Sequence, residues 1–83
     1  MFTAKVKKTG EVFMATNELT ADGVLSRDAH TLEPDKTYGG LLLEESWPGL
    51  PPLIEFSKAS WGSFSADQLE ALPGDMRLRR VTR

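Results

Sequence analysis

Cysteine is absent from this 83-residue sequence, which excludes disulfides, thiolate metal sites and a cysteine nucleophile. Small secreted domains usually need disulfides for stability, so the absence favours a reducing compartment, and we expect a cytoplasmic protein. Long apolar runs are also absent, and none of the short ones could cross a membrane or serve as a signal peptide after Met1. The sequence therefore predicts no membrane partner.

Catalytic and metal-ligating residue types are scarce. Histidine occurs once, at His30, which excludes an imidazole-rich metal site. Ser26 and Asp28 stand close to it in sequence, but the members of a hydrolase triad come from separate elements that converge in space. Glu44 and Glu45 are sequence neighbours, so on a strand they face opposite sides. We therefore expect no enzyme, no metal site and no cofactor.

The composition is that of one folded domain. Hydrophobic residues make up 40% and charged residues 27% of the sequence, and the length predicts a single domain over residues 1–83. The net charge is only −2, yet seven of the ten basic residues lie in the first eight and last seven positions. All twelve acidic residues lie between Glu11 and Asp75. If the terminal strands are neighbours, one face of the protein is basic and the rest is acidic.

Alternating apolar and polar residues indicate several short strands. Three adjacent leucines, Leu41 to Leu43, do not alternate, which indicates either a strand covered on both faces or one turn of helix. The predicted strands cover residues 2–8, 11–16, 24–25, 37–45, 53–57 and 76–81.

The first two strands form a predicted hairpin with two alternative registers. A two-residue loop pairs Val6 with Phe13 and puts Phe13 in the core. A three-residue loop with a bulge at Gly10 pairs Val6 with Val12 and puts Val12 there. We favour the bulge, because a tight type I′ turn prefers asparagine or aspartate where Thr9 stands.

One short helix is predicted over residues 65–72. Ser65 is its N-cap, Gln68 completes a capping box, and the following proline and glycine end the helix. A helix of two turns is too short to be stable alone, so Leu69 and Leu72 must dock on the sheet. The fold class is therefore α+β, mostly β. We expect a small bent antiparallel sheet or SH3-like barrel of about five strands, because the layout resembles SH3-like barrels, with one short helix before the last strand.

Residues 47–52 read Trp-Pro-Gly-Leu-Pro-Pro and form a stiff loop. A stiff loop loses little entropy on docking, and tryptophan is enriched in binding hot spots. The candidate protein-binding residues are Trp47, Leu50, Pro51 and Pro52. The alternative is that Trp47 folds back as a lid on a thin core. The other tryptophan, Trp61, is expected to pack in the core under the start of the helix.

Basic side chains on the first and last strands offer a second candidate surface. If these strands are adjacent, the side chains would form a nucleic-acid-binding row, although an acidic isoelectric point near 5.3 argues against it. Charged strand faces that discourage edge pairing explain the same residues. The row consists of Lys5, Lys7, Arg77 and Arg79.

The functional expectation is a small, non-enzymatic protein-binding module. Small chains without catalytic motifs are common among accessory proteins of phages and mobile elements, which bind and inhibit a host protein. We expect this chain to act in that way on a protein partner. The alternative is a nucleic-acid-binding small β-barrel that uses the basic terminal strands.

Overall fold

The computed structural model describes residues 1–20, 22–47, 53–73 and 76–81. Strands dominate these residues, and one turn of 3₁₀-helix, η1 (Ala66–Gln68), is the only helical element among them. The strands are β1 (Phe2–Val6), β2 (Val12–Leu19), β3 (Leu25–Asp28), β4 (Thr37–Glu44), β5 (Leu53–Phe56), β6 (Lys58–Ser65), β7 (Leu69–Ala71) and β8 (Arg77–Arg80). The mostly β character predicted from the sequence is confirmed.

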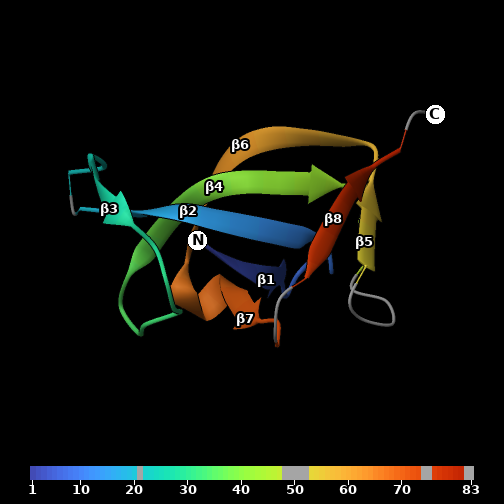
Figure 1. Cartoon of the computed structure of the whole chain (residues 1–83). Helices are drawn as coiled ribbons and strands as arrows, with labels where there is room; N and C mark the ends of the chain where they lie inside the picture. Colours follow the sequence, from blue (N-terminus) through green and yellow to red (C-terminus); the bar gives the residue numbers. More distant parts are fainter. Residues whose placement is uncertain (21, 48–52, 74–75, 82–83) are drawn as a thin grey trace.

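One bent antiparallel sheet and one two-stranded ribbon make up the described fold (Figure 1). The sheet has the order β6-β4-β2-β1-β7, and β3 pairs with the part of β2 that β1 does not reach. β5 and β8 pair in parallel to form the ribbon. The small antiparallel sheet is confirmed. The SH3-like barrel is wrong, because the short β7 takes the outer edge of β1 while β8 pairs with β5, so the sheet does not close.

The first hairpin has neither of the two predicted registers. Phe13 pairs with Ala4, and the Gly10 N–H donates to the Val6 carbonyl at 2.7 Å. The loop therefore spans residues 7–10, and Gly10 has a φ of 82° at its end. The favoured register is wrong, because Val6 lies opposite Glu11 and not Val12. The Val6 N–H donates to the Glu11 carbonyl at 2.9 Å while the Val6 carbonyl accepts from Gly10, which is the pattern of a bulge at a left-handed glycine.

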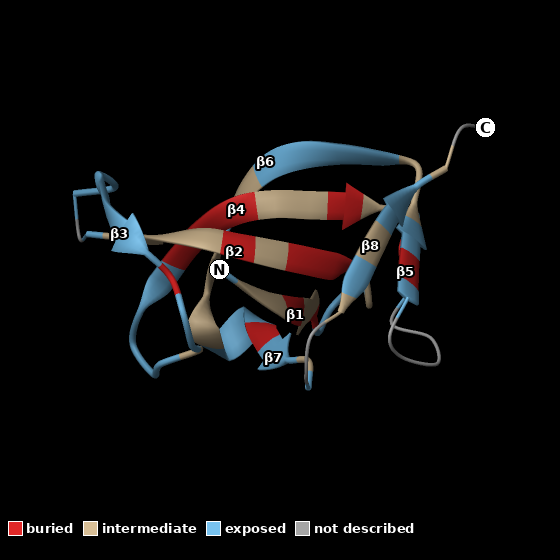
Figure 2. Ribbon diagram, viewed as in Figure 1, coloured by how far each residue is buried: buried red, intermediate tan, exposed pale blue. Residues whose placement is uncertain are grey.

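β2 is the centre of the sheet and is buried on both faces where β1 and β4 flank it (Figure 2). Val12 and Phe13 are both fully buried, in different clusters, since successive side chains of a strand point to opposite faces. The leucines of β4 behave in the same way: Leu42 packs on the cluster of Phe13, and Leu43 belongs to that of Val12. This confirms the prediction of a strand covered on both faces.

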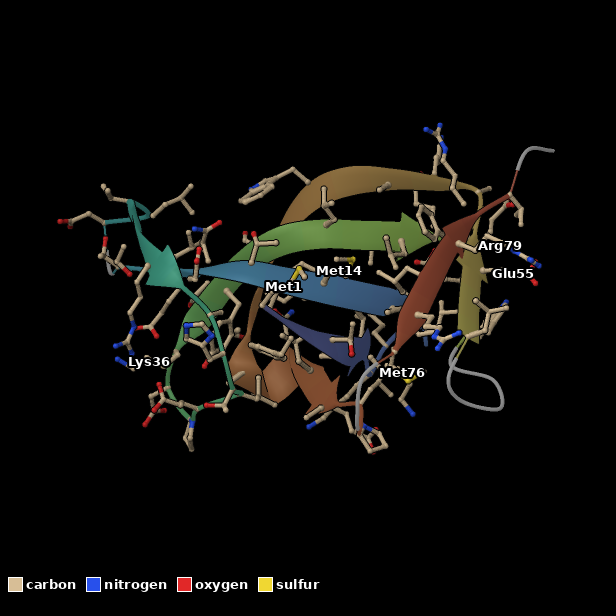
Figure 3. All side chains as sticks on the ribbon, viewed as in Figure 1. Met1, Met14, Lys36, Glu55, Met76 and Arg79 are labelled. Atoms are coloured by element: carbon tan, nitrogen blue, oxygen red, sulfur yellow. The ribbon has the colours of Figure 1, made fainter. Side chains whose placement is uncertain are left out.

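The ribbon of β5 and β8 covers one end of one sheet face (Figure 3). Ile54 of β5 is fully buried in a cluster with Val12 and Leu43, and Leu78 and Met76 pack against it. The arginines that alternate with them on β8 are exposed. β8 therefore turns Leu78 toward the core and its arginines toward solvent.

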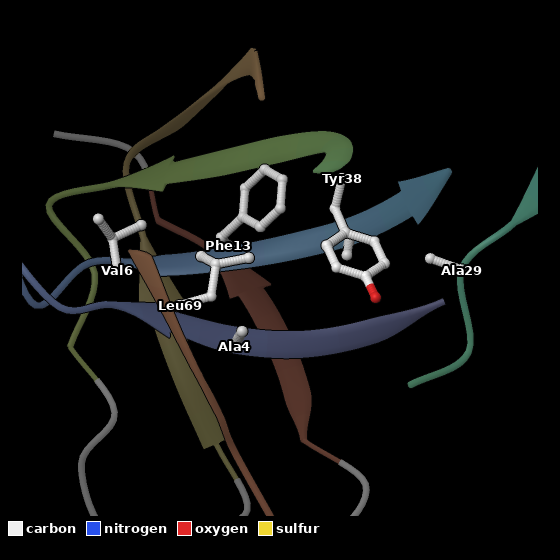
Figure 4. Packing of buried hydrophobic residues seen from close by; sticks show 7 residues of the cluster. Ala4, Val6, Phe13, Ala29, Tyr38 and Leu69 are labelled. Carbon is white, nitrogen blue, oxygen red and sulfur yellow. The ribbon is translucent and has the colours of Figure 1, made fainter. Parts of the chain in front are cut away.

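The opposite face of the sheet carries the larger cluster (Figure 4). Phe64 of β6 packs its ring on Phe13 with an edge-to-face geometry, at 4.9 Å between centroids, and Phe2 does the same on Tyr38 at 5.3 Å. The buried members of the cluster are Ala4, Val6, Phe13, Ala15, Ala29, Tyr38 and Leu69.

The helix predicted over residues 65–72 is wrong. The Ser65 N–H donates to Gln68 Oε1 at 3.0 Å, as a capping box requires, but the helical backbone ends with η1. β7 begins at Leu69, which pairs with Val6 of β1. Leu69 and Leu72 therefore pack in different clusters and not side by side. Residues 69–71 therefore pair with the free edge of β1, because a helix this short is not stable on its own.

Candidate functional site

Ser46 fixes the backbone just after β4. Its side chain is fully buried, and its hydroxyl accepts a hydrogen bond from the Val12 N–H at 2.9 Å. The same hydroxyl donates to the Leu43 carbonyl. These two bonds tie the end of β4 to β2, so the next residue, Trp47, leaves the sheet from a defined position.

Trp47 lies against the hairpin turn but faces solvent. Its ring contacts Gly10, where a Cβ atom would come 2.9 Å from the ring carbon Cζ3. The side chain is nevertheless 66% exposed, so the alternative that Trp47 is a core lid is wrong. Beside the ring lies an open hollow of about 450 Å³, lined by Thr9, Glu11, Glu45 and Trp47.

These four residues and Gly10 define what we call the Trp47 surface. The Glu45 N–H donates to Glu11 Oε2 at 3.1 Å, which ties the chain after β4 to the hairpin. The surface thus combines an exposed aromatic ring with two carboxylates. Leu50, Pro51 and Pro52, which the sequence placed in the same binding loop, lie outside the described residues.

Trp61 is not in the core, contrary to the prediction. It lies on β6 opposite Leu41, and its side chain is 56% exposed. Its ring covers Gly39 of the neighbouring strand, where a Cβ atom would come 2.8 Å from the ring carbon Cζ2. The prediction failed because it placed Trp61 beneath a helix that does not form. An exposed tryptophan on β6 is the functional candidate that sequence reasoning missed.

The structure does not bring the predicted nucleic-acid-binding row together. That row was Lys5, Lys7, Arg77 and Arg79. β1 has β2 and β7 as neighbours, whereas β8 lies in the separate ribbon, so the terminal strands are not adjacent, which the row required. Lys5 pairs with Glu70 at 3.2 Å. Arg79 pairs with Glu55 at 2.7 Å (Figure 3). Nucleic-acid binding stays a prediction, without the continuous basic row on which it was based.

A second polar cluster surrounds Glu18 near β3. Arg27 lies 3.0 Å and Lys36 3.3 Å from its carboxylate, whose side chain is only 12% exposed. The hydrogen bond from Arg27, helped by Lys36, holds the pKa of Glu18 below its ordinary value. Ser26 donates its hydroxyl to the Glu18 backbone carbonyl at 2.8 Å, which is a structural contact at the end of the sheet.

Metal-ligand clusters and membrane-length helices are both missing from the part of the chain that the structure describes. Within residues 1–20, 22–47, 53–73 and 76–81, no three histidine, aspartate or glutamate side chains come together as metal ligands. Over the same ranges, no helix has the length and apolar character that a membrane crossing requires.

Comparison with known proteins adds no family to this description. No family model, no curated relative and no solved structure matches the chain.

Proposed function

We propose that this chain is a small protein-binding module that acts by occupying the surface of another protein, with the Trp47 surface as its contact region. One observation carries the proposal: Trp47 is 66% exposed, whereas the adjacent Ser46 is fully buried and hydrogen-bonded on both sides. A large aromatic side chain presented from a fixed backbone loses little freedom on docking. Tryptophan is also among the residues that contribute most to binding hot spots.

The acidic residues beside Trp47 indicate the chemistry that a complementary partner would need. Glu11 and Glu45 line the hollow beside the Trp47 ring. A partner that fits would place an apolar side chain against the ring and N–H donors or basic groups at its rim. The expected mode of action is inhibition: the module covers a surface of its partner, as accessory proteins of phages and mobile elements do.

Substitution of Trp47 tests the proposal. Trp47→Ala should weaken partner binding by about 2 kcal/mol or more, roughly 30-fold in Kd, because it removes the central contact. Its free energy of unfolding should change by less than about 1 kcal/mol, because a mostly exposed side chain contributes little to folding. Affinity capture from an extract of the source cells identifies the partner, and calorimetry with the purified pair gives Kd.

Trp61→Ala is the matched control, since it removes the other exposed tryptophan from a different part of the sheet. It should leave partner affinity unchanged within about twofold. A folded Trp47→Ala variant that binds the partner as well as the natural chain would overturn the proposal. Urea melts of all three proteins show whether any loss of binding reflects unfolding.

A further inference from the structure

β6 forms one edge of the sheet along its whole length (Figure 1). It spans Lys58–Ser65 and pairs with β4 on one side, from Lys58 opposite Glu44 to Ser65 opposite Thr37. Among the residues that the structure describes, no strand pairs with its other side. An edge of this kind presents unpaired backbone N–H and C=O groups to solvent.

The hydrogen-bond ladder shows which backbone groups point outward. The Ala66 N–H donates to the Lys36 carbonyl at 2.9 Å, one step beyond the end of the β4–β6 pairing. In an antiparallel pair the backbone groups of successive residues point to alternate sides. The N–H and C=O groups of Ala59, Trp61 and Ser63 therefore point away from β4, where another strand could pair with them.

The strand edges at β7 and β8 are protected in ways that β6 is not. β7, at the far edge, has only three residues, and its Glu70 pairs with Lys5. The exposed positions of β8 carry arginines. By contrast, residues 59–65 contain no charged residue and no proline. Charges, prolines and short strands are the usual means by which proteins prevent edge pairing, so β6 lacks this protection.

We infer that β6 is a self-association edge, on which a second copy of this chain adds its own β6 in antiparallel orientation. Identical edges can pair about a two-fold axis, which makes a closed dimer. Two observations favour a second copy: residues 59–65 of the edge are uncharged, so no like charges meet where the copies pair, and a net charge of −2 gives little repulsion between copies.

The outward groups define the register of this pairing. With the axis at Trp61, Ala59 of one copy lies opposite Ser63 of the other, and the two Trp61 residues lie opposite each other. This register uses all three outward residues on each chain. Opposed side chains of an antiparallel pair lie on the same face, so the two half-exposed indole rings would cover each other. This surface lies outside the Trp47 surface, and either proposal can fail without the other.

Sedimentation equilibrium of the purified chain is the first test. We expect the mean mass to rise with concentration from 9.2 kDa toward twice that value. Ser63→Pro removes one outward N–H per copy without touching the β4 ladder, and it should raise the dimer Kd by about tenfold or more. Ser63→Thr keeps the N–H and favours a strand, so it is the matched control and should still dimerise.

Amide hydrogen exchange locates the contact. In concentrated samples the amides of Ala59, Trp61 and Ser63 should exchange at least about tenfold more slowly than in dilute ones. Those of Ser60 and Gly62 point toward β4 and should not change with concentration. If Ser63→Pro does not fold, Trp61→Lys carries the test, because it places two like charges opposite each other at the axis and should abolish the dimer.

Two results would overturn the inference. One is a natural chain that stays at 9.2 kDa up to ~1 mM, which would leave the edge for a strand of a different polypeptide. The other is a dimer that persists unchanged in both Ser63→Pro and Trp61→Lys, which would place the contact elsewhere.

Discussion

Gly40 shows how one residue sets the path of the central strands. It faces the place where the β2–β4 register shifts, between Ala15 and Asn17. A Cβ atom at Gly40 would lie 1.9 Å from the carbonyl oxygen of Met14, which is a backbone atom and cannot rotate away. Only glycine allows β2 and β4 to approach this closely.

Gly40→Ala should therefore destabilise the protein by about 3 kcal/mol or more, since the strands must separate to admit a methyl group. Gly62→Ala is the control, because Gly62 pairs with Gly40 on the neighbouring strand. Its Cβ would meet only the ring of Phe64, at 3.3 Å. That change should cost less than about 1 kcal/mol. Urea melts compare the two, and equal losses would contradict the explanation.

At the scale of elements, η1 and β7 together replace the predicted helix. Leu69 is buried in the larger cluster, whereas Leu72 is partly buried on the other side of the sheet. Leu69→Ala should cost on the order of 2–4 kcal/mol, and Leu72→Ala clearly less. The free energies of unfolding from denaturant melts check this order. Equal losses from the two substitutions would contradict the assignment of β7.

β1, β2, β4, β5 and β8 were predicted to within a few residues, because each carries apolar residues that pack in one or both clusters. β6 gave no such signal: its residues are mostly serine, alanine and glycine, which are weak strand formers, and its pairing comes from β4. The helix was predicted from a real capping box at Ser65, which here caps one turn only. The local sequence therefore predicted the turn of η1 correctly. It could not show that the following residues pair with β1 instead of continuing the helix.

The candidate site was predictable only in part. Residue type and the neighbouring prolines singled out Trp47, but its exposure depends on contacts that are distant in sequence. Ser46 bonds to Val12, and the Trp47 ring rests on Gly10. The placement of the basic terminal residues failed for a similar reason, because topology, and not sequence position, decides which strands are neighbours.

At the scale of the whole molecule, stability should depend on acid through Glu18. Arg27 and Lys36 hold its pKa below the ordinary value of 4.5 in the folded state. Its contribution to stability is therefore fully present above that value, and it is lost as the pH falls below 4.5 through the lower folded-state pKa.

Glu18→Gln should be less stable than the natural chain at neutral pH, and the difference should shrink as the pH falls to about 3. Urea melts of both proteins across this range measure the effect. Arg27→Gln is the companion variant and should reduce the same pH dependence, because Arg27 is the main cause of the shift. A constant difference between Glu18→Gln and the natural chain at every pH would contradict the assignment.

The parallel ribbon has a consequence for the order in which the chain folds. The strands of the main sheet pair antiparallel, whereas β5 and β8 pair in parallel, and the buried Ile54 of β5 packs on Val12 and Leu43 of that sheet. Parallel pairing is slow, and the surface that the ribbon covers exists only once β2 and β4 have paired. We expect the ribbon to form after the transition state. Until it does, the apolar surface at Val12 and Leu43 is open to water, and this is the interval in which the chain is most prone to aggregate.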